Sequence, residues 1–246
     1  MAPTIYKSSW PSVPIVQESI FTHIFKNTER QDRLAFIDAA SGREFTQRDV
    51  RDHALSLGHG LLHEVYKNGS CAQLRRGDTI MVFSQNHFLF PVLIFGTFAA
   101  GLRATLASSN SSPSELLNQW KDSMSKYIIA SSSLVPVALK MLELAGIRPE
   151  DAAKRMIVFV DGVSTESLPA LPFISYEDIT GKGMLKEEEK FPGEQANETA
   201  LLCYSSGTSG LPKGVEVWIT LSSPMGSFID VGQISSPTDL FPQERT

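Results

Sequence analysis

The sequence predicts an α/β fold with a largely parallel β-sheet and helices on its faces. Between residues 77 and 162, short apolar runs typical of buried strands alternate four times with longer segments of helical periodicity. Parallel strands need such long connections, which are usually right-handed helical crossovers. The 246 residues are 42% hydrophobic and 20% charged, which is typical of a globular protein that can bury a sizeable core.

Three elements are expected before this alternation. The sequence predicts a short helix over residues 16–27 and a β-hairpin in "AFIDAASGREFT", with Ser41 and Gly42 at the turn. Apolar residues then recur at helical spacing and predict a helix with one buried face. These residues are Val50, Ala54, Leu57, Leu61 and Val65.

Two histidines, His59 and His63, lie four residues apart on the opposite face of that helix. A pair at this spacing can bind a metal ion, but the sequence suggests no third ligand. We interpret the pair as part of a solvated helix face, and we assign no metal ligand.

The alternating region has recognisable strand sequences and helix ends. "DTIMVFS", "RATLA", "KYIIAS" and "RMIVFVDG" predict the strands. We expect Asn86 to cap a helix over 87–100 that ends at Gly101. The apolar run over 88–102 is short for a membrane span and contains a proline, so we interpret it as a buried core helix.

The next two helices have clear end signals. Ser112 is predicted as an N-cap, with Pro113 at the first helical position and Glu115 completing a capping box, for a helix that reaches about Met124. The run "LVPVALKMLELA" predicts the following helix, which Gly146 ends.

Residues 162–197 read as a surface connection, in which we interpret the acidic run "KEEEK" as a solvated loop. Strand character returns with "TALLCY". It is followed by a loop that combines three glycines, several hydroxyls and Lys213, a composition suited to holding phosphate. A flexible Gly/Ser hairpin connection is the alternative interpretation.

The loop differs from a Walker A loop at two positions, because Pro212 replaces the second glycine and Gly214 replaces the metal-binding hydroxyl. A Walker loop also opens a helix, whereas "VEVWIT" alternates like a strand. A Walker-type NTPase is therefore the less favoured reading, and we predict a phosphate loop between two strands.

The stretch "YSSGTSGLPKGV" resembles the phosphate loop of the adenylate-forming (AMP-binding) acyl-CoA synthetases, and it looks most like the 4-coumarate–CoA ligase and luciferase branch. Upstream, "GREFTQRDV", "RRGDTIMVFSQNHFLFPVLIFGTFAAG" and "SPSELLNQWKDSMSKYIIAS" resemble blocks of the same family. The fold would then be the N-terminal part of the large domain of such an enzyme, and incomplete.

The resemblance implies ATP-dependent activation of a carboxylic acid to an acyl-adenylate, followed by thioester formation with coenzyme A. It implies ATP, Mg2+ and coenzyme A as cofactors, and Lys213 in a supporting catalytic role on the β- and γ-phosphates. The expected phosphate-binding residues are Ser205, Ser206, Gly207, Thr208, Ser209, Gly210, Lys213 and Gly214.

The resemblance stops after Val215, where the family expects a threonine-histidine segment. We therefore expect residues 1–215 to form a partial AMP-binding domain and residues 216–246 to be a disordered tail outside the family. The ligase would be truncated and inactive alone, with uncovered sheet edges that favour self-association. A non-catalytic nucleotide-binding or regulatory fragment is the alternative.

The composition sets the remaining expectations. A formal net charge of -5 argues against nucleic acid as the main partner. Two cysteines and no signal-peptide pattern indicate a cytoplasmic protein, although full-length relatives include peroxisomal enzymes. No transmembrane segment is expected.

Overall fold

The computed structural model describes residues 18–39, 41–68, 73–162, 168–190, 195, 198–205 and 212–218. Within these residues a seven-stranded sheet has the order β7-β6-β5-β3-β4-β8-β9, and a separate two-stranded sheet pairs β1 with β2. All neighbours in the large sheet are parallel except β8 and β9, which are antiparallel. The predicted largely parallel α/β fold is confirmed.

The strands have the following bounds: β1 Leu34–Ile37, β2 Glu44–Thr46, β3 Thr79–Phe83, β4 Arg103–Ala107, β5 Ser125–Ser131, β6 Met156–Phe159, β7 Ile174–Ser175, β8 Thr199–Ser205 and β9 Lys213–Trp218. The α-helices are α1 Ile20–Phe25, α2 Gln47–His63, α3 Val65–Asn68, α4 Phe90–Ala99, α5 Pro113–Asp122, α6 Val135–Leu144, α7 Pro149–Ala153 and α8 Tyr176–Ile179. Two short 3-10 helices, η1 Thr28–Arg30 and η2 Ser132–Leu134, complete the elements.

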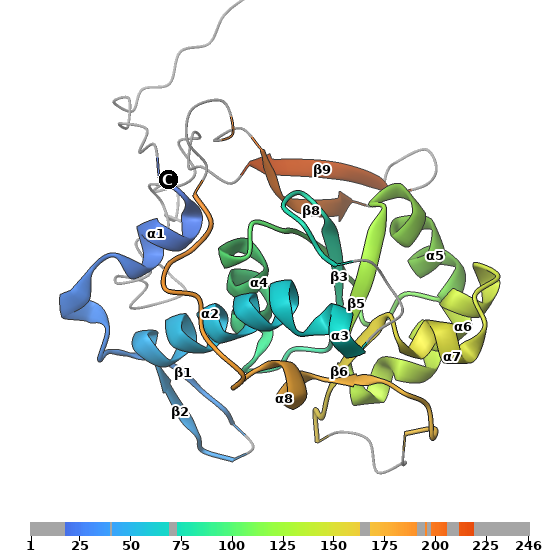
Figure 1. Cartoon of the computed structure of the whole chain (residues 1–246), viewed down its shortest axis with the longest axis horizontal. Helices are drawn as coiled ribbons and strands as arrows, with labels where there is room; N and C mark the ends of the chain where they lie inside the picture. Colours follow the sequence, from blue (N-terminus) through green and yellow to red (C-terminus); the bar gives the residue numbers. More distant parts are fainter. Residues whose placement is uncertain are drawn as a thin grey trace, which may run out of the picture.

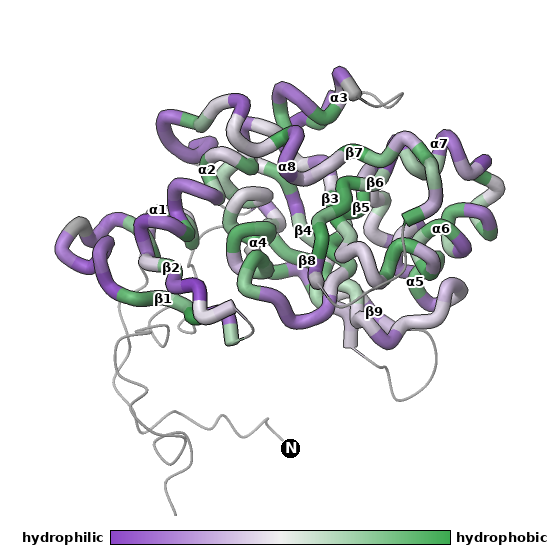
Figure 2. Tube along the Cα trace, turned by 90° about the horizontal axis from the view of Figure 1, so that it is seen from below, coloured by the Kyte–Doolittle hydropathy of each residue, from purple (hydrophilic) through white to green (hydrophobic). Residues whose placement is uncertain are grey.

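The sheet separates two layers of helices (Figure 1). Alternate side chains of a strand point to opposite faces, so Ile80 and Val82 of β3 pack with α2 and α4, whereas Met81 and Phe83 pack with α5 and α6. All five residues of β3 are buried because helices cover both faces. Figure 2 shows the hydrophobic residues concentrated in β3, β5 and α4, at the centre of the molecule.

The predicted hairpin and amphipathic helix are confirmed, and the helix predicted over residues 16–27 spans only Ile20–Phe25 within the described part of the chain. β1 and β2 form the expected hairpin, and Gly42 in its turn has a φ of 71°. Thr46 caps α2 and forms a capping box with Asp49. The predicted apolar stripe of α2 and α3 is buried; Leu57 and Leu61 are both 0% exposed.

Helix α4 begins at Phe90, so the prediction of a helix from His87 capped by Asn86 is wrong. A turn precedes the helix, in which the Phe90 N–H donates to the carbonyl oxygen of His87 at 2.9 Å. No side chain caps α4. Pro91 explains the later start, because a proline is tolerated only in the first turn of a helix.

Within the described part of the chain, no helix is long and apolar enough to cross a membrane. Helix α4 is instead a core helix, as predicted, with Val92 and Leu93 both 0% exposed. It packs on α2, where Gly96 allows close approach; a Cβ there would lie 2.8 Å from Cδ2 of Leu57.

The interpretation of "KEEEK" as a solvated loop is wrong at Glu188, which is only 6% exposed. The segment after α8 runs along α2 and reaches α1 (Figure 1). The Leu185 N–H donates to the carbonyl oxygen of Leu55, and the Glu189 N–H donates to that of Ala99. The carboxylate of Glu188 remains buried because hydroxyl groups of α1 hydrogen-bond it.

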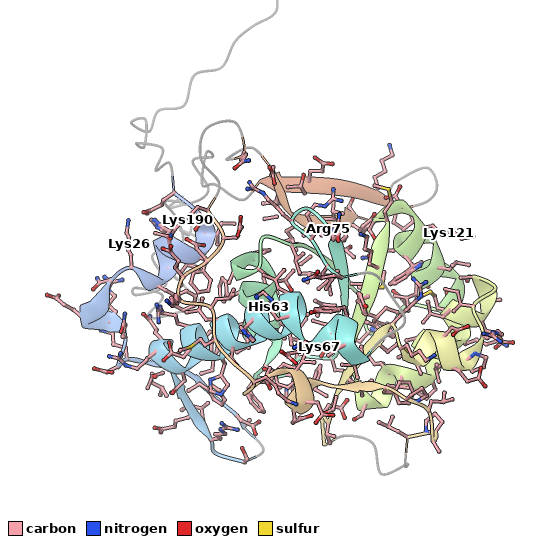
Figure 3. The ribbon with its side chains drawn as sticks, viewed as in Figure 1. Lys26, His63, Lys67, Arg75, Lys121 and Lys190 are labelled. Atoms are coloured by element: carbon pink, nitrogen blue, oxygen red, sulfur yellow. The ribbon has the colours of Figure 1, made fainter. Side chains whose placement is uncertain are left out.

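The histidine pair on α2 is only partly solvated. His63 is exposed and lies on the outer side of the helix (Figure 3), whereas His59 is half-buried. Gly183 packs directly on His59, since a Cβ at Gly183 would lie 2.5 Å from Cε1 of the imidazole ring. The solvated-face interpretation therefore holds for His63 and fails for His59.

Candidate phosphate-binding site

The predicted phosphate loop joins two antiparallel strands, β8 and β9. In their register Cys203 faces Val215, Tyr204 faces Gly214, and Ser205 faces Lys213 at the mouth of the loop. A strand therefore follows the loop, as the alternation of "VEVWIT" predicts, and the loop is not of the Walker type.

The structure describes only part of the predicted site. Ser205, Lys213 and Gly214 lie together at the loop mouth, and the side chains of Ser205 and Lys213 are exposed. The other predicted phosphate-binding residues, Ser206, Gly207, Thr208, Ser209 and Gly210, lie outside the described residues. Their roles remain predictions.

Strand β8 positions the loop at the carboxyl edge of the parallel sheet. It pairs with β4 through Ala104–Leu201 and Thr105–Leu202. The loop therefore emerges beside the segment that follows β4, where serine and asparagine side chains gather. In open α/β sheets ligands bind at this edge.

Two hollows lie along this edge. One has a volume of about 630 Å3 between α5 and the β8–β9 hairpin, and its walls include Ser108, Asn110, Gln119, Asp122, Tyr204 and Pro212. The second has a volume of about 510 Å3 between the segments after β3 and β4, and its walls include Ser84, Gln85, Asn86, Ser108, Ser109 and Asn110. Both walls are rich in hydroxyl and amide groups.

Helix α5 forms one side of the larger hollow and is firmly attached to the sheet. Its predicted capping box is confirmed, with Ser112 accepting from the Glu115 N–H and the Glu115 carboxylate accepting from the Ser112 N–H. The Gln119 side-chain amide donates to the Thr105 hydroxyl at 2.8 Å and to the Leu106 carbonyl oxygen at 3.0 Å. Leu116 and Trp120 are buried against the sheet.

The loop base has a contact to α5 that the sequence pattern does not reveal. The Tyr204 hydroxyl donates a hydrogen bond to the carboxylate of Asp122, the last residue of α5. Burial, and then Asp122, raise the pKa of the Tyr204 phenol, so it stays protonated at neutral pH. Tyr204 belongs to the motif that the sequence shows, but Asp122 lies 82 positions away and no sequence pattern links the two residues.

Cys203, one residue before Tyr204, is not activated as a nucleophile. Burial raises the pKa of its thiol, which favours the unreactive protonated form. This agrees with the position of Cys203 in β8, where its side chain is half-buried.

The donors described at the loop mouth suit a phosphate group. Ser205 on one strand is paired with Lys213 on the other, so a hydroxyl group and an ammonium group are both available at this point of the hairpin. Within the described residues no group of three or more His, Cys, Asp or Glu side chains could hold a metal ion. The role of Mg2+ remains a prediction.

The sequence and the fold are similar to those of known proteins. A family model described as "AMP-binding enzyme" matches residues 25–219. The chain is 30% identical over 217 residues to 4-coumarate–CoA ligase-like 8 of Arabidopsis thaliana, covering 86% of the chain and 36% of that relative. It is 27% identical over 215 residues to 4-coumarate–CoA ligase of Vanilla planifolia, covering 86% of the chain and 35% of the relative.

The fold is also found among solved structures. A benzoate CoA ligase from Burkholderia xenovorans superposes with a TM-score of 0.61 at 19% identity, over 82% of this chain and 34% of that one. This likeness concerns the fold. The chain spans about a third of the length of the relatives it matches.

Proposed function

The chain belongs to the AMP-binding enzyme family, and on that premise we propose that it provides the phosphate-binding part of an ATP-dependent carboxylate–CoA ligase. In such a reaction the carboxylate attacks the α-phosphorus of ATP and pyrophosphate leaves; the thiol of coenzyme A then attacks the acyl carbon of the acyl-adenylate, AMP leaves, and a thioester remains. One observation supports the proposal most directly. The β8–β9 hairpin places Ser205 opposite Lys213 at the carboxyl edge of the sheet.

In this proposal the loop holds the β- and γ-phosphates while the α-phosphorus reacts. The Lys213 ammonium group neutralises charge that builds up on the departing pyrophosphate. The hydroxyls of Ser205, Ser206, Thr208 and Ser209 donate hydrogen bonds, and Gly207, Gly210 and Gly214 permit close approach of the backbone. The residues act by orientation and charge stabilisation, on which such transfers mainly depend.

Binding of inorganic tripolyphosphate to the purified 246-residue chain tests this role. Loss of one charge-assisted hydrogen bond costs about 1.5–3 kcal/mol, so Lys213→Ala should weaken binding roughly tenfold to a hundredfold. Lys140→Ala serves as the matched control, because Lys140 is an exposed lysine on α6, paired with Glu143. Equal affinities of the wild type and Lys213→Ala would contradict the assignment.

We further propose that the 246-residue chain by itself binds nucleotide phosphate without completing the reaction. The motivating observation is its coverage of 36% and 35% of two relatives. The family resemblance places contacts to adenine, ribose and the acyl group in later segments. The chain should therefore give no ATP–pyrophosphate exchange with a panel of aromatic and aliphatic carboxylic acids, and measurable exchange would refute this proposal.

The domain division also remains a proposal. Strand β9 continues through the expected boundary after Val215 as far as Trp218, and residues 219–246 lie outside the described part. We propose that the AMP-binding domain ends near residue 219, where the family match ends, rather than after Val215, that the residues after it form a separate tail, and that the protein is cytoplasmic. Limited proteolysis with mass spectrometry would test the boundary. The proposal predicts that the first cleavages occur after residue 218.

Self-association through uncovered strands is proposed for the isolated chain. β9 ends the described sheet on one side, and Val215 and Val217 are 53% and 39% exposed. Leu34 and Ile37 of the two-stranded sheet are 50% and 56% exposed. Exposed apolar edge strands favour pairing between chains. Val215→Lys with Val217→Lys should raise the monomer fraction in sedimentation velocity, and an already monomeric wild type would refute the proposal.

A further inference from the structure

Tyr204 lies between the phosphate loop and helix α5 and contacts both sides. In the hairpin its strand partner is Gly214, next to Lys213. A Cβ added at Gly214 would lie 3.1 Å from Cζ and 3.2 Å from the hydroxyl oxygen of Tyr204. The phenol ring therefore packs on the glycine, and a side chain at that position would crowd the ring.

The other contact of Tyr204 reaches an anchored part of the fold. Its hydroxyl donates to the carboxylate of Asp122, which ends α5. One helical turn earlier, Gln119 attaches α5 to β4, the strand beside β8. The tyrosine thus connects the base of the loop to a helix that is itself held by the sheet.

We propose that Tyr204 is a positioning residue for phosphate binding: its ring on Gly214 and its hydrogen bond to Asp122 set the orientation of the hairpin and hence of Lys213. This inference rests on the proposed phosphate-binding role of the loop. It assigns Gly214 a further reason to be glycine, which is space for the Tyr204 ring. It also assigns Asp122, 82 residues away in the chain, to the support of the site.

The hydrogen bond between Tyr204 and Asp122 lies near the surface, so its effect on the position of the loop base can be distinguished from an effect on the stability of the whole domain. Asp122 is exposed and Tyr204 half-buried, so their hydrogen bond adds little to the stability of the whole domain. Its loss should instead act locally, on the two strand ends that carry Ser205 and Lys213. A purely structural contact would change the thermal midpoint and phosphate affinity together.

Tripolyphosphate binding to the full 246-residue chain tests the proposal through four variants. Tyr204→Phe and Asp122→Ala should each lower the affinity about threefold to tenfold, with a nearly unchanged thermal midpoint. The double variant should lose no more than either single one, because both remove the same bond. Asp122→Asn keeps an acceptor oxygen and should stay within about twofold of the wild type.

The asparagine variant also controls for charge. Removing a carboxylate near an anion site by itself strengthens anion binding, so a pure charge effect predicts tighter binding in both Asp122→Ala and Asp122→Asn. Weaker binding in Asp122→Ala with rescue in Asp122→Asn supports the hydrogen bond. Tighter binding in both variants overturns the proposal.

Hydrogen exchange at the loop base gives a readout that needs no ligand. The amides of Ser205 and Lys213 should exchange faster in Tyr204→Phe than in the wild type, whereas amides of β3 should not change. If the wild type fails to bind tripolyphosphate, the proposed function is wrong, while the exchange experiment still decides whether Tyr204 orders the loop base. Unchanged exchange overturns the positioning role.

Discussion

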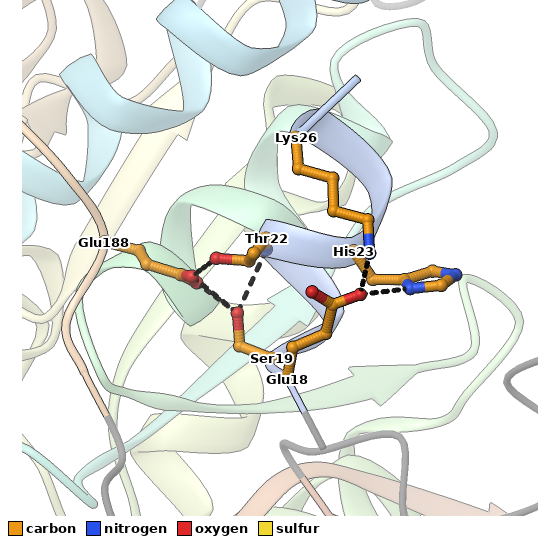
Figure 4. A network of polar contacts seen from close by, with 6 residues as sticks. All are labelled: Glu18, Ser19, Thr22, His23, Lys26 and Glu188. Carbon is orange, nitrogen blue, oxygen red and sulfur yellow. Dashed lines mark hydrogen bonds and ion pairs between the residues drawn. The ribbon is translucent and has the colours of Figure 1, made fainter. Parts of the chain in front are cut away.

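The carboxylate of Glu188 accepts a hydrogen bond from the hydroxyl of Ser19 at 2.6 Å, although 169 residues separate them in the chain (Figure 4). The Thr22 hydroxyl donates to the same carboxylate. Ser19 is also the N-cap of α1 and accepts from the Thr22 N–H at 3.0 Å. One buried acidic side chain therefore holds the segment after α8 against the first helix.

Replacement of Glu188 should destabilise the fold. Glu188→Ala leaves two hydroxyls without their acceptor and should lower the free energy of unfolding by about 2–3 kcal/mol. Glu188→Gln keeps one acceptor oxygen and should lose less. Glu187, whose side chain is 71% exposed, provides the matched control, and Glu187→Ala should stay within about 0.5 kcal/mol in urea denaturation. Equal losses at both positions would contradict the buried role of Glu188.

Gly60 allows α2 to pack against α8. A Cβ at this position would lie 2.3 Å from the carbonyl oxygen of Ile179, a backbone atom that cannot turn away. Alanine favours a helix over glycine by about 1 kcal/mol, but Gly60→Ala should still destabilise the protein by roughly 2 kcal/mol or more because the clash dominates.

Gly58→Ala is the comparison for Gly60→Ala. Its methyl group would meet Cδ1 of Leu185 at 2.8 Å and the Gly96 carbonyl oxygen at 3.2 Å. The closest atom belongs to a side chain that can rotate, so the loss should be smaller. Chemical denaturation of both variants measures the difference, and a more stable Gly60→Ala would show that the α2–α8 contact is looser than described.

The two predicted helix caps should differ in their contribution to stability. Ser112 caps α5, and Ser112→Ala should cost about 1 kcal/mol. Asn86 was also predicted as a cap, but α4 begins later and has no side-chain cap. Asn86→Ala should therefore leave the free energy of unfolding nearly unchanged, and a loss equal to that of Ser112→Ala would restore the original prediction.

His59 should make stability depend on pH. Burial, and then the neighbouring His63, lower the pKa of its imidazole below 6.5, while Glu64 opposes the shift. Since the unfolded chain then binds the proton more readily, the contribution of neutral His59 is complete above about pH 6.5 and is lost as the pH falls through the lowered pKa. The thermal midpoint should therefore decrease as the pH is lowered from 7.5 to 5.

Variants of His59 and His63 test which histidine causes this change of the thermal midpoint with pH. His59→Gln should remove most of the decrease in thermal midpoint. His63→Gln should reduce it only in part, because the burial of His59 still lowers the pKa of its imidazole. The charge of Lys67 also lowers the pKa of His59, and salt screens this effect, so the ionic strength is kept constant throughout. An identical pH profile in the wild type and His59→Gln would exclude His59 as the source.

Much of the fold could be predicted because its signals are local. The capping box of α5 involves residues three positions apart, and the alternation in "VEVWIT" indicates β9 directly. The pattern that predicts a phosphate loop likewise consists of consecutive residues. For the loop residues outside the described part, Ser206 to Gly210, sequence remains the only source of the assignment.

Tertiary structure decided what depends on contacts between distant segments. The sequence determined an α/β fold, the hairpin around the loop and membership of the AMP-binding enzyme family. It did not determine that β8 lies beside β4, that Glu188 is buried under α1, or that Asp122 accepts a hydrogen bond from the Tyr204 hydroxyl. Local backbone preferences and short-range hydrogen bonds involve residues of the same turn or strand. They therefore leave a pattern in neighbouring residues of the sequence. Whether a carboxylate lies in water or against two hydroxyls depends on which surface the folded chain brings to it.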